Sequence, residues 1–290
     1  MTKDNQDYFI TLVLLCSYGL FIQTRPSEPY KTNYLTDPEW KNLTTNSVYD
    51  EIFPIWPYSS FALSIPIFLL TDYLKYKPVI ILEGIAYIIT WSLLIWADGV
   101  KWMQVMEFMF GVCTATEVAY YTYIYAKVSA DKYKQVSSYT RSAYLFGRFA
   151  CGILSQFLIS YHILDYGQLN YISLVNISIA FIVSLFLPRV DESIYFHGSH
   201  RISSTASEKQ QQHPYQGLWT DLKKAYSKRS VVSWSVWVVL ATCGYYQIGN
   251  YIQSLWLDII PGKTKIEFII VCKNGIFQLT EKSFHLTKKS

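Results

Sequence analysis

Two glutamates, Glu107 and Glu117, lie inside the apolar stretch 103–126, where a carboxylate can bind a cationic ligand. At ~1.5 Å of rise per residue, a helix over this stretch is long enough to cross the ~30 Å hydrocarbon core of a bilayer. A charge at the centre of a membrane helix costs roughly 2.5–3.5 kcal/mol, so acidic residues found there usually have a function. The stretch is therefore the first candidate for a binding site.

The two glutamates belong to one polar stripe on the helix that this stretch predicts. At ~100° per residue, Glu107, Phe110, Thr114, Glu117 and Tyr121 fall within an arc of about 80°. Acidic, aromatic and hydroxyl groups along one face indicate a water-filled cavity that receives a cation with an aromatic body. The alternative is that each acid is protonated, or is neutralised by a neighbouring helix as part of helix packing.

The composition is typical of a polytopic α-helical membrane protein. Of the 290 residues, 51% are hydrophobic, 17% aromatic and only 16% charged, whereas a soluble domain carries more charge and shorter apolar runs. In a bilayer every backbone polar group needs an internal partner, which helices provide. The lipid bilayer is thus a predicted partner, and the lack of interleaved basic and aromatic residues argues against binding of nucleic acid.

The remaining reactive residues indicate neither enzymatic nor metal chemistry. The five cysteines are scattered and form neither a CxxC pair nor a Cys/His spacing, which predicts no zinc site and no disulfide framework. No nucleophile and base stand in an arrangement typical of catalysis. We therefore expect no cofactor, no metal ion and no enzyme activity.

Six apolar runs predict an N-terminal bundle of six transmembrane helices over residues 1–187. The expected spans are about 8–23, 52–71, 79–97, 103–126, 138–161 and 170–187. A partly disordered cytoplasmic loop is expected at 188–230, a seventh transmembrane helix at 231–258 and a divergent polar tail at 259–290. Two prolines end the first span and leave Glu28 near its mouth, where solvation is the alternative to a binding role.

The basic residues determine the expected orientation. Lysine and arginine concentrate in the links after the second, fourth and sixth spans, so the positive-inside rule places these links and the N-terminus in the cytoplasm. The sequon Asn42-Leu-Thr44 then lies on the outer side of the membrane, as N-glycosylation of Asn42 requires. The two signals agree on one topology.

Several short strings resemble one family of vitamin carriers. They are Arg25-Pro-Ser-Glu-Pro29, Glu51-Ile-Phe-Pro54, Tyr76-Lys-Pro-Val-Ile-Ile81, Glu117-Val-Ala-Tyr-Tyr121 and Asn250-Tyr251. Through them the chain is similar to the thiamine transporters and the reduced folate carrier, which are solute carriers of the major-facilitator type. Six spans, a long loop and a seventh helix look like the first half of such a twelve-helix carrier, truncated after the seventh helix.

Within this family the chain resembles the thiamine branch. Folate is an anion, and its carrier is expected to offer arginine in the region of the fourth span, whereas this chain has Glu107 and Glu117 there. The resemblance implies a plasma-membrane protein that takes up thiamine, or a related cationic vitamin, by alternating access. The substrate-binding residues that it implies, together with those of the stripe, are Glu28, Phe53, Trp56, Glu107, Phe110, Glu117, Tyr121 and Asn250.

The resemblance also implies a role for each kind of residue. Glu107 or Glu117 would balance the charge of the thiazolium ring. Phe53 and Trp56 would supply ring faces for stacking or cation–π attraction, worth ~0.5–2 kcal/mol, unless they form core packing or an interfacial belt. A second carboxylate or Asn250 would hydrogen-bond the pyrimidine amine, and for Asn250 an interhelical hydrogen bond is the alternative.

Three residues depart from the pattern expected of the thiamine branch. Phe110 stands where a tyrosine is expected, which removes one hydrogen bond to the substrate. Arg148 lies in the middle of the fifth span and either pairs with a glutamate of the fourth span or lines the cavity. Glu83, near the cytoplasmic end of the third span, is expected to snorkel toward water.

Two other functions stay open at this point. The chain is alternatively a folate-type vitamin carrier, or a non-transporting truncated isoform or fragment of a carrier. A lone half-bundle has no partner bundle to close its cavity, so self-association of two copies is a further hypothesis.

Overall fold

The structure, a computed structural model, describes residues 3–127 and 132–190, with 223–224, 226–237, 239–241 and 243–244. The chain divides into two compact units, Met1–Asp191 with Val271–Ser290, and Glu192–Ile270. The described residues are helical and contain no strand, and several of their helices are long and apolar enough to cross a membrane. The predicted all-α membrane class is therefore confirmed.

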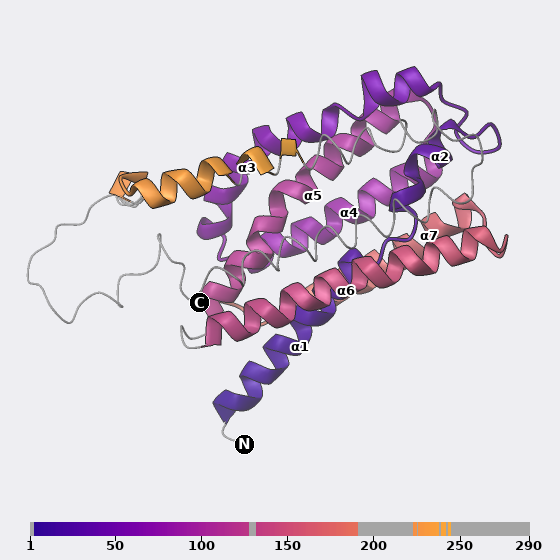
Figure 1. Cartoon of the computed structure of the whole chain (residues 1–290). Helices are drawn as coiled ribbons and strands as arrows, with labels where there is room; N and C mark the ends of the chain where they lie inside the picture. Colours follow the sequence, from indigo (N-terminus) through magenta and orange to yellow (C-terminus); the bar gives the residue numbers. More distant parts are fainter. Residues whose placement is uncertain are drawn as a thin grey trace, which may run out of the picture. The chain divides into compact units, whose positions relative to one another are not determined.

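The first unit is built from long helices joined by short turns (Figure 1). The elements are α1 (Lys3–Gln23), η1 (Glu28–Tyr30), α2 (Lys31–Thr36), η2 (Ser47–Ile52), α3 (Ile55–Tyr73), α4 (Lys77–Trp96), α5 (Val100–Lys127), α6 (Tyr133–Ser160) and α7 (Tyr166–Phe186). Each of the six predicted spans corresponds to one of the long helices, with ends that differ by a few residues. Hydrophobic runs thus predicted these helices correctly.

Five segments of the described chain have the length and composition of membrane spans. They are Tyr8–Thr36, Ser47–Thr71, Lys77–Trp96, Tyr133–Ser160 and Tyr166–Phe186. The helix α5 is not among them, because its two glutamates and its other polar residues lower its mean hydropathy. Its 28 residues nevertheless extend about 42 Å, and it packs along α3 and α4. We therefore place α5 in the membrane with its neighbours.

The predicted seventh helix lies within the second unit, and the structure describes only part of it. Arg229–Ala241 is a short apolar helix, below the length of a membrane span. The rest of the predicted helix, the tail 259–290 and most of the loop 188–230 lie outside the described residues. The predicted domain boundaries therefore stay predictions.

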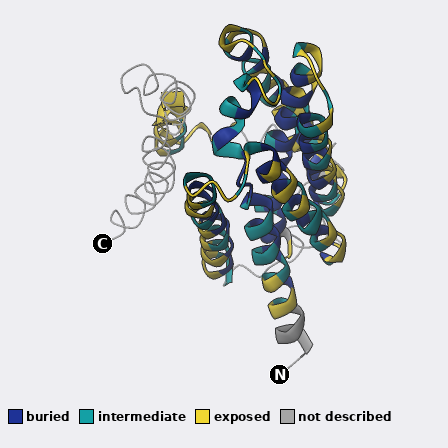
Figure 2. Ribbon diagram, turned by 90° about the vertical axis from the view of Figure 1, so that its right-hand side faces the viewer, coloured by how far each residue is buried: buried dark blue, intermediate teal, exposed yellow. Residues whose placement is uncertain are grey.

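Two groups of helices form the interior of the first unit. The helix α5 packs against α3 and α4, while α1 packs against α6 and α7, and α4 contacts α7 to connect the two groups. Buried residues line the sides on which these helices face one another, and exposed residues occupy the outer sides (Figure 2). Buried tyrosines in this interior find acceptors: Tyr120 donates to the Leu15 carbonyl oxygen at 2.9 Å, and Tyr30 to Gln156 Oε1 at 2.7 Å.

The interruption between α1 and α2 lies inside the unit. Pro26 and Pro29 carry no N–H group and cannot continue a helix, so α1 ends at Gln23. Arg25 and Ser27 are 5% and 3% exposed, which places the broken backbone away from solvent. The freed amides still have acceptors, because the Glu28 N–H donates to the Arg25 carbonyl oxygen at 3.1 Å. Such a break is tolerated within a membrane where protein surrounds it.

Replacing Gly147 with alanine is expected to lower the free energy of unfolding by about 1–3 kcal/mol, because α1 and α6 touch there and overpacking forces the backbone to move. A Cβ atom at this position would lie 2.6 Å from the backbone oxygen of Leu20. Thermal unfolding of the purified protein measures the effect. The matched control is Gly244→Ala, where the added Cβ meets no described atom within 4 Å. Equal melting temperatures for wild type and Gly147→Ala would contradict this close contact.

Candidate functional site

The predicted polar stripe lies on the continuous helix α5. Its residues therefore share one face of that helix, as the spacing predicts. Glu107 and Phe110 are buried, at 1% and 9% exposed, and Thr114, Glu117 and Tyr121 are half-buried. Along the stripe, α5 meets residues of α2, α3, α4 and α6. The stripe has two ends with different partners, one around Glu107 and one around Glu117.

Glu107 forms an ion pair that the sequence did not reveal. Lys31 Nζ, from the first turn of α2, lies 2.6 Å from Glu107 Oε1. The same ammonium lies 5.2 Å from the centre of the Phe53 ring and 5.0 Å from the centre of the Phe110 ring. Distances of this size allow cation–π attraction. A carboxylate and two aromatic rings thus surround one ammonium group, and we call Glu107, Phe53 and Phe110 the ammonium cage.

Trp56, on α3, connects the ammonium cage to the middle of α5. Its indole Nε1 donates to Thr114 Oγ1 at 2.9 Å, and its ring lies 5.5 Å from the ring of Phe110, centre to centre. Phe110 also meets Tyr87 and Trp91 of α4 edge-on. The sequence-predicted residues Phe53, Trp56, Glu107 and Phe110 are therefore brought together.

Glu28 belongs to a second group of charges beside the cage. Arg25 Nη2 lies 2.8 Å from Glu28 Oε2, and the Arg25 guanidinium lies over the rings of Tyr87 and Trp91, at 4.8 and 5.4 Å from their centres. The Arg25 side chain is 4% exposed, whereas that of Glu28 is 31% exposed. Glu28 is thus an ion-paired residue that water reaches, rather than a carboxylate surrounded by solvent.

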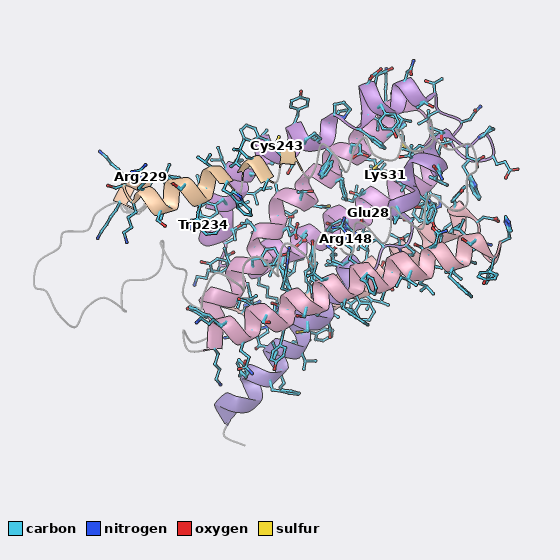
Figure 3. All side chains as sticks on the ribbon, in the orientation of Figure 1. Glu28, Lys31, Arg148, Arg229, Trp234 and Cys243 are labelled. Carbon is cyan, nitrogen blue, oxygen red and sulfur yellow. The ribbon has the colours of Figure 1, made fainter. Side chains whose placement is uncertain are left out.

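Two further cations act on Glu28 from different helices. The charges of Arg148, on α6, and of Lys31 attract the Glu28 carboxylate, although less strongly than Arg25 does. Figure 3 shows Glu28 between Lys31 and Arg148 in the first unit. Three cations (Arg25, Lys31 and Arg148) therefore accompany two carboxylates (Glu28 and Glu107) in this region.

Glu117 lies at the other end of the stripe, where tyrosines surround it. Tyr144 of α6 donates to Glu117 Oε1 at 2.8 Å, and Tyr121 donates to the same oxygen at 3.2 Å. Arg141 Nη1 in turn donates to the Tyr121 hydroxyl at 2.6 Å. Within the described residues, Glu117 has no cation at salt-bridge distance. Its carboxylate is thus oriented by hydrogen bonds while its charge is not cancelled by direct contact.

The expectation that Glu83 snorkels toward water is wrong. Glu83 is 2% exposed, and Tyr18 of α1 donates to its Oε2 at 2.9 Å. The packing of α4 against α7 and α5 covers this part of α4, so a carboxylate with a short side chain does not reach the surface. The sequence places Glu83 near a helix end, and only the neighbouring helices decide that the position is interior.

Sequence reasoning missed the two cations Lys31 and Arg141. A signal for each was present in the spacing. Arg25, Glu28 and Lys31 recur every third residue, and Arg141 and Arg148 stand seven residues apart on one face of a helix. Such periodic charges inside apolar segments are themselves an indication of a polar interior.

The remaining predicted site residues are not part of this arrangement. Asn250 lies outside the described residues, so its binding role stays a prediction. Asn42 is exposed in the loop between α2 and η2, an accessible position for an N-glycan. Within the described chain, no group of three or more His, Cys, Asp or Glu residues could hold a metal ion.

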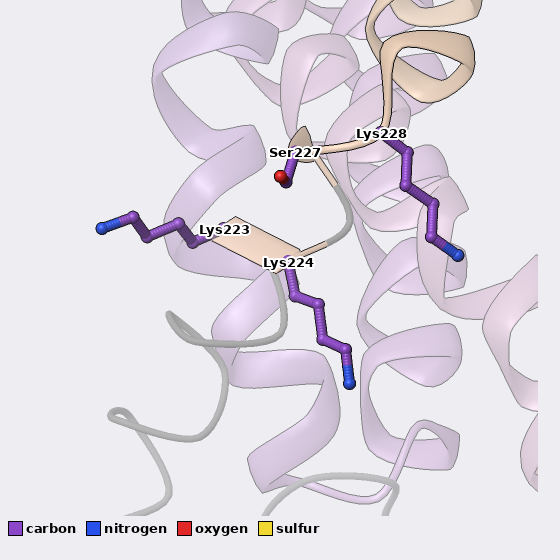
Figure 4. Close-up of a pocket in the computed structure, with 4 residues that line it drawn as sticks. All are labelled: Lys223, Lys224, Ser227 and Lys228. Atoms are coloured by element: carbon purple, nitrogen blue, oxygen red, sulfur yellow. The ribbon is translucent and has the colours of Figure 1, made fainter.

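A shallow surface depression lies in the second unit. Its lining residues are Lys223, Lys224, Ser227 and Lys228. The lysine side chains point in different directions rather than toward a common centre (Figure 4). The depression therefore offers no convergent binding groups, and the stripe on α5 is the better candidate site.

Comparison with known proteins agrees with the likeness expected from the short strings. Residues 6–278 match the family described as Reduced folate carrier. The chain is 39% identical to human Thiamine transporter 1 over 299 residues, which cover 88% of this chain and 60% of the relative. With human Thiamine transporter 2 it shares 40% identity over 299 residues, with the same coverage of both chains.

A folate transporter is also among the relatives. The chain is 38% identical to Folate transporter 1 of Caenorhabditis elegans over 265 residues, covering 86% of this chain and 58% of the relative. The chain thus spans about 60% of the length of the curated relatives that it matches.

Proposed function

Because the chain belongs to the reduced folate carrier family, we propose that it binds thiamine, or a related cationic vitamin, and carries it across the plasma membrane by alternating access. The family and the relatives are transporters rather than enzymes. The thiamine transporters share 39–40% identity with this chain. The proposal takes from them the substrate class, and from the α5 stripe the groups that bind it.

The observation that carries the proposal is the state of Glu117. Two tyrosine hydroxyls donate to it, and it has no ion-pair partner within the described chain. These hydrogen bonds orient the half-buried carboxylate, which would be the group that meets the cationic ligand. Trp56 of α3 and Phe110 of α5 lie nearer the other end of the stripe, and their ring faces would receive the aromatic part of the ligand.

The topology belongs to the same proposal. We place the N-terminus and the 188–230 loop in the cytoplasm, because the links that are rich in lysine and arginine are expected on that side by the positive-inside rule. The loop that follows α2 is proposed to lie on the outer side, where the exposed side chain of Asn42 is accessible for N-glycosylation. Asn250 is proposed to complete the site by hydrogen-bonding the aminopyrimidine.

Uptake and binding of labelled thiamine test the proposal separately. Cells that express the chain are expected to accumulate thiamine, and Glu117→Gln is expected to reduce thiamine binding by at least tenfold, about 1.4 kcal/mol, because the amide carries no charge. Glu39→Gln is the matched control, since Glu39 is an exposed carboxylate outside the site. Equal thiamine binding by wild type and Glu117→Gln would contradict the assigned role.

The same assay separates the alternatives. The three cations near Glu28 favour a folate-type substrate as a second candidate, because an anion would balance them. Saturable folate uptake without thiamine uptake would establish that candidate. Thiamine binding without uptake, beside uptake by a version extended to twelve spans, would identify this chain as a non-transporting form.

A further inference from the structure

The ammonium cage already contains a cation that belongs to the protein. Lys31 Nζ lies 2.6 Å from Glu107 Oε1 and about equally far from the Phe53 and Phe110 rings, at 5.2 and 5.0 Å. A carboxylate flanked by aromatic faces is the arrangement by which proteins recognise ligand cations. Here the side chain of Lys31 occupies that arrangement, and Glu107 is 1% exposed beneath it.

We propose that Lys31 is a specificity-determining residue, a tethered competitor whose ammonium group occupies the cation subsite formed by Glu107, Phe53 and Phe110. A cationic vitamin gains the full attraction of Glu107 only when Lys31 leaves the cage. The proposal rests on the proposed function, since it concerns the affinity of that same site for a cation. It goes beyond the proposed function by giving a role to Lys31, which is not among the binding residues that the resemblance to vitamin carriers implies.

The structure provides a place for the displaced ammonium. Glu28 precedes Lys31 by three residues, and the charge of Lys31 already acts on its carboxylate. The Glu28 side chain is 31% exposed and that of Lys31 is 19% exposed, so water reaches both groups. Rotation about the flexible four-carbon stem of lysine can therefore move the ammonium from Glu107 toward Glu28. The exchange keeps one counter-charge for Lys31 in each position.

The neighbouring cations make this exchange selective. Arg25 holds Glu28 at 2.8 Å, and Arg148 attracts it from α6. Glu28 consequently attracts the ammonium of Lys31 less strongly than an unpaired carboxylate would. The ammonium is therefore expected to stay beside Glu107 when no substrate is present. Only a ligand whose cation binds the cage better than the ammonium does, such as a delocalised ring cation that stacks on both phenylalanines, is expected to displace it.

Thiamine binding to purified full chain tests the proposal directly. Lys31→Met removes the competitor and is expected to tighten thiamine binding by about tenfold, equivalent to about 1.4 kcal/mol. The matched control is Lys41→Met, since Lys41 also pairs with a carboxylate, Asp98 at 2.8 Å, and lies over an aromatic ring, Tyr34. That control is expected to leave the affinity unchanged. Unchanged or weaker thiamine binding by Lys31→Met, in the presence of binding by wild type, would overturn the proposal.

A second measurement uses the wild-type protein, so it does not depend on the folding of any variant. Reductive methylation followed by mass spectrometry reports how accessible each lysine amine is. Saturating thiamine is expected to raise the methylation rate of Lys31 several-fold while that of Lys41 stays constant. Protection of Lys31 by thiamine would overturn the proposal, because it would mean that Lys31 stays in place under the ligand.

Two further outcomes are distinguishable. If neither wild type nor Lys31→Met binds thiamine, the proposed function fails as well. If thiamine monophosphate binds wild type more tightly than thiamine does, and Lys31→Met abolishes that preference, Lys31 is an anion ligand of the substrate rather than a competitor, and the proposal is wrong while vitamin binding stands.

Discussion

Glu28→Gln protein is expected to lose about 3–5 kcal/mol of unfolding free energy, because the substitution leaves a buried cation without its counter-charge. The Arg25 side chain is 4% exposed and its guanidinium lies 2.8 Å from Glu28. Glutamine still accepts a hydrogen bond but carries no charge, so Arg25 would lose the carboxylate with which it forms its ion pair. Thermal unfolding of the purified protein, followed by tryptophan fluorescence, measures the loss.

Two control variants make this result specific. Glu39→Gln removes an exposed carboxylate and is expected to change stability by less than about 0.5 kcal/mol. Glu28→Gln combined with Arg25→Met removes both charges and keeps an apolar side chain beneath Tyr87, so it is expected to regain at least half of the loss. If Glu28→Gln unfolds at the wild-type temperature, the ion pair does not hold Arg25 in place.

Lys31→Met is expected to destabilise the protein more than Glu107→Gln, although both break the same ion pair. Lys31→Met leaves the Glu107 carboxylate, 1% exposed, without a cation, which costs about 3–5 kcal/mol. Glu107→Gln leaves an ammonium group on a flexible stem, 19% exposed, that can turn toward water and toward Glu28, so the expected cost is only about 1–2 kcal/mol. Denaturation of the two variants side by side gives the order.

The double variant completes this comparison. Lys31→Met with Glu107→Gln leaves no charge in the ammonium cage and is expected to be more stable than Lys31→Met alone. Thiamine should stabilise Lys31→Met more than it stabilises the double variant, because only the former offers a free carboxylate to the ligand. Greater stability of Lys31→Met than of Glu107→Gln would refute the assignment of Glu107 as the more deeply buried partner.

The helices of the first unit were predictable because hydrophobic runs and prolines act locally. The runs gave α1 and α3–α7 within a few residues of their ends. Pro26 and Pro29 predicted the end of the first helix, since proline cannot continue one. They did not predict that the break would lie in the interior, because that depends on the helices around it. Arg25 and Ser27 are buried there.

Part of the candidate site was predictable for the same reason. An uninterrupted helix has a fixed angle per residue, so Glu107, Phe110, Glu117 and Tyr121 had to share one face of α5. The types of these residues then indicated a cation site. Neither argument needed the position of any other helix.

The charge partners, in contrast, were decided by tertiary structure alone. Glu107 meets Lys31 from 76 residues earlier in the chain, Glu83 meets Tyr18 across 65 residues, and Glu117 meets Tyr144 across 27. No local pattern relates such distant positions. A lone charge in an apolar interior is costly, so each carboxylate requires a partner, but which helix brings it is a property of the packing.

The sequence by itself therefore determined the membrane helices, the acidic stripe on α5 and the likeness to vitamin carriers. Only the tertiary structure decided that Glu107 is already paired, that Glu117 is held by tyrosines and that Glu83 is buried. The physical reason is that helix periodicity depends on neighbouring residues, whereas the pairing of buried charges depends on how separate helices pack together.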